Sequence, residues 1–160
     1  MHDDKKSVTL DQSKQVGSHI ATEGEFAGWT TFYDAGFENL IGPFWYRQES
    51  DGSMRCAFRA EKKHLRDSGV VHGGCLMTFA DLCLFVTAIP VLQGHGVTIH
   101  LSGDFIDVGR EGDLIVGTGE IIRAGGSLIF ARGQLTAGER TLFAFSGTIK
   151  RLRPKAGPRA

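Results

Sequence analysis

An apolar run begins at a glycine-rich turn, Gly73-Gly74, and continues to Pro90. Positions 76, 79, 80, 83, 84 and 87 share one face at helical spacing, and Met77, Phe85 and Ala88 fill much of the rest. A helix that is apolar almost all round is normally buried. The pattern therefore predicts one long helix at the centre of the hydrophobic core.

One ionisable acid, Asp81, lies inside this run. A carboxylate in a buried helix costs free energy unless a partner or a chemical use compensates for the burial. Asp81 is therefore either a functional acid or a structural acid bonded to Arg66, to Thr78 or to a backbone amide. The chemistry considered below favours the functional interpretation.

Alternating apolar and polar residues predict strands on both sides of the helix. Asp51-Gly52 marks a hairpin turn, and Gly94 and Gly96 end the helical region. Strands are expected at residues 44–49, 54–60, 97–105, 113–123, 127–136 and 141–152. The last four, about ten residues long and separated by short glycine-containing turns, are typical of an antiparallel meander.

The two ends of the chain differ from its body. Residues 1–20 and the basic segment 153–160 are polar and aperiodic or proline-containing, so we expect flexible tails. Residues 26–40 have rough helical spacing and predict a short helix that ends at Gly42-Pro43. Residues 21–152 then form a single domain.

Composition excludes several classes of function. Lys plus Arg and Asp plus Glu each number 18, so net charge indicates neither nucleic acid nor a membrane surface as partner. Asp81 and Pro90 argue against a membrane span, since a charge at the bilayer centre costs roughly 3 kcal/mol. The N-terminus does not resemble a signal peptide.

The three cysteines, Cys56, Cys75 and Cys83, lack disulfide-framework spacing. We expect reduced, buried thiols and a cytoplasmic protein. His72 and Cys75 offer only two ligands at metal-binding spacing, so no metal site is predicted.

One long helix and five to six antiparallel strands must share a single core, which a curved sheet wrapped around the helix achieves. This α+β arrangement is the hotdog fold. Val71-His72-Gly73-Gly74 followed by Ala80-Asp81 resembles the signature of hotdog acyl-CoA thioesterases of the phenylacetate-degradation (PaaI-like) type. Segments 97–106, 112–113 and 123–128 fit the same family, and the resemblance covers roughly residues 42–150.

The resemblance implies hydrolysis of a small or medium acyl or aryl-acyl coenzyme A thioester to the free acid and CoA. It also implies a homodimer or homotetramer, with CoA as part of the substrate and no separate cofactor. By the same resemblance Asp81 is the catalytic carboxylate, Gly73 the amide that binds the thioester oxygen, and Thr98 a hydroxyl that places water.

One residue departs from the family pattern: Arg66 stands where many members carry an asparagine six residues before the histidine. An arginine cannot both donate and accept hydrogen bonds as an asparagine amide does. An acyl-CoA binding protein with little or no catalysis is therefore the alternative. Candidate substrate-binding residues are His72, Gly74, Arg66, Arg123, Gly125 and Ser127, although 125–127 also suit a plain hairpin turn.

The residue types suit thioester hydrolysis. Unpaired amides at the helix start, Gly73, Gly74 and Cys75, would stabilise negative charge on the carbonyl oxygen. Asp81 would activate water or attack the carbonyl carbon itself. Hydration of an enoyl thioester ranks lower, because His72 lies too far from Asp81 along the helix.

Distance along the helix adds a constraint. Gly73 and Asp81 are eight residues apart, which corresponds to about 12 Å along a helix. Reacting groups must lie within about 3 to 3.5 Å of the substrate atoms. If both residues act on one thioester, they come from different chains, and a two-fold dimer with antiparallel helices would form such a composite site.

Overall fold

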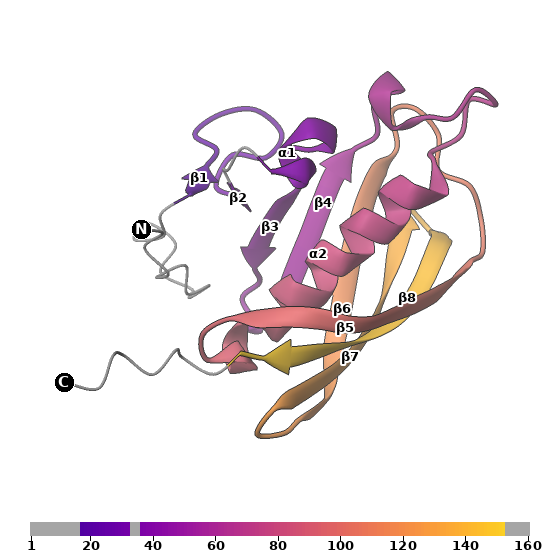
Figure 1. Cartoon of the computed structure of the whole chain (residues 1–160). Helices are drawn as coiled ribbons and strands as arrows, with labels where there is room; N and C mark the ends of the chain where they lie inside the picture. Colours follow the sequence, from indigo (N-terminus) through magenta and orange to yellow (C-terminus); the bar gives the residue numbers. More distant parts are fainter. Residues whose placement is uncertain (1–16, 33–35, 153–160) are drawn as a thin grey trace.

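The computed structural model of the chain describes residues 17–32 and 36–152. The elements in chain order are β1 (Ser18–Ile20), β2 (Thr30–Phe32), α1 (Phe37–Ile41), β3 (Trp45–Gln48), β4 (Met54–Arg59), the 3₁₀ turn η2 (Lys62–His64), α2 (Gly73–Leu92), β5 (Gly96–Phe105), β6 (Leu114–Ala124), β7 (Leu128–Ala137) and β8 (Arg140–Arg151). One long helix and one sheet dominate the fold, as Figure 1 shows.

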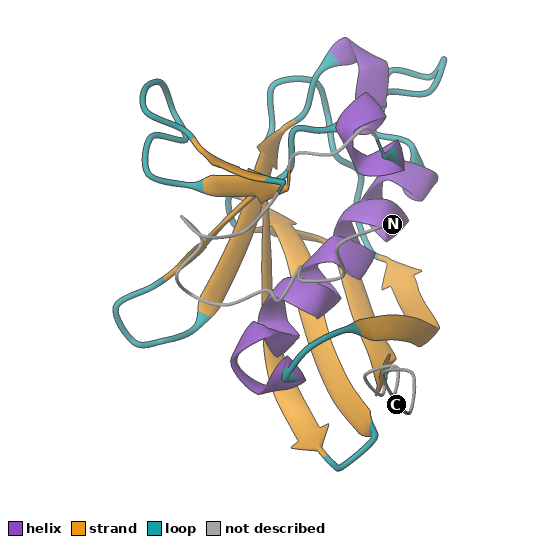
Figure 2. Cartoon of the chain, turned by 60° about the vertical axis from the view of Figure 1, so that its left-hand side comes forward, coloured by secondary structure: helices purple, strands orange, loops and turns teal. Residues whose placement is uncertain are grey.

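The strands form one eight-stranded antiparallel sheet in the order β1-β2-β3-β4-β6-β7-β8-β5. The sheet curls around α2, so that the helix lies against its concave face (Figure 2). The predicted α+β architecture, a curved antiparallel sheet around a central helix, is therefore confirmed. The predicted strand count of five to six is wrong, because β1 and β2 extend the sheet beyond β3.

The placement of β5 differs from a simple meander. β6, β7 and β8 are joined as consecutive hairpins, but β6 pairs with β4 on its other side. β5 instead pairs with β8 and forms one edge of the sheet. β5, the strand that follows α2 in the chain, thus lies at the edge of the sheet and next to the outer face of α2.

The predicted helix at residues 26–40 is wrong. Thr30 and Thr31 are buried in β2, which pairs with β3, and β-branched residues favour such a strand over a helix. Gly28 adopts a φ of +82° just before it, which breaks any helix there. The short helix α1 covers only 37–41, and residues 33–35 of the predicted helix lie outside the described part.

Residues 18–20, which the sequence pattern assigned to the N-terminal tail, form β1 and pair with β2. Residues 1–16 of that tail and the predicted C-terminal tail, 153–160, lie outside the described residues. The predicted turn at Asp51-Gly52 joins β3 to β4, with Gly52 at a φ of +85°.

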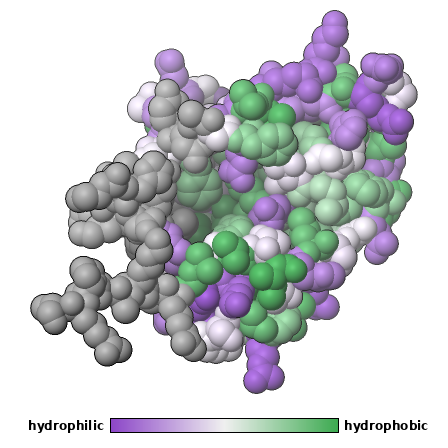
Figure 3. All heavy atoms as spheres, viewed as in Figure 1, coloured by the Kyte–Doolittle hydropathy of each residue, from purple (hydrophilic) through white to green (hydrophobic). Residues whose placement is uncertain are grey.

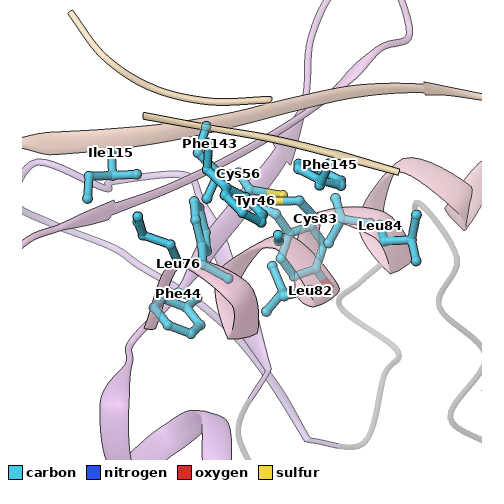
Figure 4. Packing of buried hydrophobic residues seen from close by; sticks show 14 of the residues in the cluster. Phe44, Tyr46, Cys56, Leu76, Leu82, Cys83, Leu84, Ile115, Phe143 and Phe145 are labelled. Atoms are coloured by element: carbon cyan, nitrogen blue, oxygen red, sulfur yellow. The ribbon is translucent and has the colours of Figure 1, made fainter. Parts of the chain in front are cut away.

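The core lies between α2 and the concave face of the sheet. Every position on the predicted helical face is buried, as are Leu82, Val86 and Ile89. Phe79 packs against Phe44 and Phe58, with ring centroids 5.1 Å and 4.7 Å apart. Figure 4 shows the crowding of such side chains around the helix. By length and composition α2 would also suit a membrane span, but it packs here as the core helix of a sheet.

All three cysteines of the chain are free and buried, as predicted. Cys83 on α2 lies against β6, where a side chain at Gly117 would collide with its sulfur. Burial and the neighbouring Cys56 thiol hold the pKa of Cys83 well above its usual range. These thiols fill the core rather than carry chemistry.

The helix continues two residues beyond Pro90, to Leu92, and ends just before Gly94, which the pattern predicted as the end of the helical region. Gln93 then adopts a left-handed conformation, with a φ of 52°. Arg151 on β8 donates hydrogen bonds to the carbonyl oxygens of Val91 and Leu92, at 2.5 Å and 3.1 Å, and to that of Gly125. A guanidinium therefore satisfies the carbonyls left open at the end of the helix.

Candidate active site

Asp81 is joined to the neighbouring edge strand. The Thr98 hydroxyl on β5 donates a hydrogen bond of 2.7 Å to Asp81 Oδ1. A register shift between Thr98 and His100 marks a β-bulge at this point in β5, and bulges commonly re-aim side chains near active sites. Thr78, which the sequence offered as a structural partner of Asp81, instead donates its hydroxyl to the Gly74 carbonyl.

A hollow of about 630 Å³ opens beside Asp81. Its lining residues come from α1 with the preceding Gly36, from α2 and from β5: Gly36, Phe37, Glu38, Met77, Thr78, Asp81, Thr98 and Leu101. We call it the Asp81 hollow. Its volume lies within the roughly 300–1,000 Å³ range of small-molecule sites. The half-buried carboxylate thus faces a space large enough for a ligand.

The N-terminus of α2 is capped by its own motif. His72 Nδ1 accepts a hydrogen bond of 2.9 Å from the Gly74 amide, and the His72 carbonyl accepts from the Cys75 amide. The expectation of three unpaired amides is therefore wrong for Gly74 and Cys75. Within the described residues, Gly73 keeps its amide free of such a bond, which makes it the amide suited to a ligand oxygen.

A side chain would be crowded at both glycines of this motif, more severely at Gly74 than at Gly73. A side chain at Gly74 would lie 2.9 Å from His72 Nδ1 and would disturb the cap. A side chain at Gly73 would lie 3.1 Å from the ring of Phe105. The two glycines therefore keep the start of the helix accessible and the histidine cap in place.

A second hollow, of about 420 Å³, lies at this end of the helix. Its lining residues are Phe37, Ile41, Lys63, His64, Leu65, His72, Gly74, Cys75 and Thr78. We call it the His72 hollow. Phe37 and Thr78 line both hollows, so the two spaces adjoin. In one chain Asp81 and His72 nevertheless line different spaces, which argues against a paired acid and histidine acting on one carbon.

His64 shapes the wall of the His72 hollow and was missed by the sequence analysis. Its Nδ1 accepts from the Glu61 amide at 2.8 Å, and its Nε2 donates to the Ile41 carbonyl at 2.5 Å. Burial holds the pKa of His64 below its usual range, only partly offset by the bond to Ile41. A neutral imidazole therefore links the loop before α2 to the end of α1.

Cys75 places a thiol in the lining of the His72 hollow. Burial raises the pKa of its thiol to about 11, and Lys63 lowers it only slightly. Because the thiolate is the nucleophilic form, this thiol is unreactive near neutral pH. The carboxylate of Asp81 is then the better candidate for the reacting group.

Other predicted site residues lie apart from Asp81. Arg66 is exposed in the loop before α2 and lines neither hollow. Arg123, Gly125 and Ser127 belong to the β6–β7 hairpin, where Gly125 donates to the Leu128 carbonyl. Arg151 ties this hairpin to the C-terminus of α2, roughly 30 Å along the helix from Gly73. Within one chain the fold does not bring the hairpin to the acid.

One stripe of α2 stays half-open. Met77, Thr78, Asp81 and Phe85 lie at helical spacing and are only partly buried, unlike the faces that meet the sheet. Next to this stripe β5 forms an edge of the sheet with no further strand among the described residues, and its Val97 and Ile99 are exposed by 41% and 53%. Figure 3 shows hydrophobic residues exposed on this side of the molecule. Such a face is typical of an interaction surface.

Comparison with known sequences identifies the family. The model described as the thioesterase superfamily matches residues 68–144. A Pseudomonas aeruginosa protein described as a candidate esterase is 34% identical over 116 residues, covering 69% of this chain and 84% of the relative. Human acyl-coenzyme A thioesterase 13 is 25% identical over 101 residues, covering 62% and 72%.

Solved structures agree on the fold. A protein of Streptococcus pneumoniae described as a hypothetical thioesterase, determined with coenzyme A, superposes with a TM-score of 0.63 at 21% identity, covering 71% of this chain and 91% of that one. A mutant of the phenylacetic acid degradation protein PaaI from Thermus thermophilus gives 0.64 at 20% identity, covering 72% and 98%. The chain belongs to the thioesterase superfamily and is a thioester hydrolase. The predicted hotdog fold and its resemblance to the PaaI type are confirmed.

Proposed function

We propose that this chain hydrolyses acyl-CoA thioesters to the free acid and CoA, with a small or medium acyl or aryl-acyl group. The observation that carries the proposal is the Asp81 carboxylate, held by Thr98 at the wall of an open hollow. The name of the human relative and the coenzyme A bound to the pneumococcal structure support the choice of substrate.

In the proposed reaction Asp81 takes a proton from a water molecule, which attacks the thioester carbon. The carbon–sulfur bond then breaks, and CoA leaves as the thiol with the proton that Asp81 had taken. The Thr98 hydroxyl fixes one carboxylate oxygen, so that the other can face the water. The Gly73 amide, at the positive end of the α2 dipole, binds the oxygen on which negative charge develops. Direct attack by the carboxylate through an anhydride uses the same residues.

The site is proposed to be composite, with Gly73 from one chain and Asp81 from the other. The supporting observations are their separation along α2, the half-open stripe of the helix and the exposed apolar side chains on the edge strand β5. Two copies related by a two-fold axis, with antiparallel helices, would bring each helix start toward the partner's acid. A further pairing of dimers into tetramers and a cytoplasmic location remain predictions, the latter supported by the three free thiols.

Thiol release from a panel of alkyl and aryl acyl-CoA esters tests the function. Asp81→Asn keeps the shape and the hydrogen bond acceptor but removes the base, so kcat is expected to fall at least a hundredfold. Asp67→Asn, at an exposed acid that lines neither hollow, is the matched control and retains full activity. Undiminished turnover in folded Asp81→Asn would contradict the role of the acid.

Micromolar binding of acyl-CoA without any thiol release would instead favour the binding-protein alternative. That alternative was motivated by Arg66, and it predicts a gain of turnover in Arg66→Asn. Within the described chain Arg66 lines neither hollow, so no contact of this residue supports the binding-protein alternative.

A further inference from the structure

The start of α2 is held by the loop between β5 and β6, residues 106–113, which we call the β5–β6 loop. The Val71 amide donates a hydrogen bond of 2.8 Å to the Gly109 carbonyl of this loop. The contact is close, because a side chain at Gly109 would lie 2.9 Å from Val71 Cγ2. Gly73, whose amide is proposed to bind the thioester oxygen, follows Val71 by only two residues. The loop therefore helps to set where that amide lies.

Two further backbone contacts fix the segment before Gly73. Val70 pairs with Arg110 of the β5–β6 loop as an isolated antiparallel bridge. The His72 amide donates a hydrogen bond of 2.8 Å to the His64 carbonyl. The segment that leads into α2 is thus anchored by the loop on one residue and by His64 on the next, and the loop is the anchor that depends on a charged side chain.

That side chain is Arg140, the first residue of β8. Its Nη1 donates a hydrogen bond of 2.7 Å to the Val108 carbonyl, and its Nη2 donates one of 2.8 Å to Asp113 Oδ2. The same Asp113 oxygen accepts a hydrogen bond of 2.9 Å from the Arg110 amide. Because Val108 and Arg110 flank Gly109, one guanidinium fixes the backbone on both sides of the carbonyl that anchors the helix start.

The ion pair of Arg140 with Asp113 is sheltered. Its side chains are exposed by 33% and 23%, whereas those of the Arg132–Glu120 pair are exposed by 65% and 62%. Burial alone would raise the pKa of Asp113, but the bonds from the Arg110 amide and from Arg140 outweigh it and hold this pKa below its usual range. Charge-assisted bonds of this kind fix geometry more firmly than an exposed pair does.

We propose that Arg140 is a positioning residue for thioester hydrolysis: its guanidinium fixes the β5–β6 loop, and the loop places the Gly73 amide against the thioester oxygen. The inference rests on the proposed function and adds to that site a residue that lines neither hollow. A donor that stabilises developing charge must be held in place before the reaction, and a displacement of about 1 Å can cost a hundredfold in rate. Loosening the loop should therefore lower kcat and leave KM nearly unchanged.

The test measures thiol release by Arg140→Met, which keeps the apolar stem of the side chain and removes its charge and its donors. With the ester of the panel that the native protein hydrolyses fastest, kcat should fall about tenfold and KM should change less than about twofold. Arg140→Lys restores a charge and a donor and should bring kcat to within about threefold of native. Arg132→Ala, at the exposed pair with Glu120, is the matched control and should keep native kcat.

Amide hydrogen exchange separates positioning from a merely structural role. In folded Arg140→Met the Val71 amide, whose acceptor lies in the β5–β6 loop, should exchange about tenfold faster than in the native protein. The Arg151 amide, bonded to the Ser127 carbonyl near the other end of α2, should keep its native rate. Arg151→Ala is the converse control, because it destabilises the fold at that other end and should leave both kcat and the exchange of Val71 unchanged.

Failure of the inference and failure of the proposed function give different results. Native kcat in folded Arg140→Met, an equal fall of kcat in Arg151→Ala, or native exchange of the Val71 amide in Arg140→Met would overturn the inference and leave the thioesterase intact. Absence of thiol release from every ester by the native protein would overturn the proposed function and the inference with it.

Discussion

Thr98 on β5 donates a hydrogen bond of 2.7 Å to Asp81 on α2 and so joins the central helix to the edge strand of the sheet. The bond fixes the orientation of an acid that a largely apolar helix would otherwise leave mobile. It also binds the acid to the strand whose Val97 and Ile99 side chains are exposed. A shift of the β5 edge strand would therefore move the Asp81 carboxylate through the hydroxyl of Thr98.

Thr98→Val removes the hydroxyl and keeps the shape of the side chain. We expect kcat of thiol release to fall about tenfold, because general-base catalysis depends on a positioned carboxylate. Thr98→Ser, which keeps the hydroxyl, should retain most of the activity. Native kcat in folded Thr98→Val would show that the bond does not position the acid.

Cys75 should resist thiol reagents. With its pKa raised to about 11 by burial, only about one molecule in a thousand carries the thiolate at pH 8. A chromogenic disulfide reagent should therefore react slowly with the native protein and rapidly with all three thiols in denaturant. Fast labelling of native Cys75 at neutral pH would contradict its assignment as an inert thiol.

His64 makes stability depend on pH. Burial holds its folded-state pKa below the value of about 6.5 that is usual for histidine. The unfolded chain therefore binds more protons at mildly acidic pH. The stabilisation is present above pH 6.5 and is lost as pH falls toward the folded-state pKa. Urea unfolding should show this loss, and His64→Gln should reduce it. An equally steep loss in the variant would assign it to other groups.

Arg151 should stabilise the fold without taking part in catalysis. Its guanidinium bonds three carbonyl oxygens at the end of α2 and in the β6–β7 hairpin. Arg151→Ala leaves these acceptors unpaired and should lower the free energy of unfolding by about 2 kcal/mol. Lys150→Ala, at the exposed neighbouring residue, should change it by less than about 0.5 kcal/mol. Equal effects of the two variants would refute the capping role.

Local patterns predicted the long helix, the strands that follow it and the acid within it, because burial of an apolar face and strand alternation are periodic in sequence. Residues 26–40 misled the same reasoning: their aromatic spacing suited a helix, but pairing with β3 made part of them a strand. Tertiary pairing overrode local preference there.

The site was only partly predictable. Asp81, Gly73 and His72 belong to one recognisable motif, whereas Phe37, Glu38 and Leu101 reach the hollow from separate elements. Their convergence depends on how α1 and β5 pack against α2, which no local pattern encodes. The occupied amides of Gly74 and Cys75 likewise follow from the histidine cap, a contact that spacing alone does not fix.

The composite site is the central claim, and two inactive variants test it. Gly73→Pro removes the amide hydrogen at the first helical position, where proline is tolerated. Gly73→Ala is its matched control, since it adds a comparable side chain beside Phe105 and keeps the amide. Asp81→Asn removes the acid. Each of Gly73→Pro and Asp81→Asn should form an inactive homodimer.

The most direct measurement mixes these two variants, lets subunits exchange and follows thiol release. In an equal mixture half the dimers are hybrids, and each hybrid contains one site with both an intact helix start and an intact acid. The account predicts recovery of about a quarter of native activity, given random exchange of two-fold dimers. If hybrid dimers form and the mixture stays inactive, Gly73 and Asp81 do not act across the interface, and the composite site is contradicted.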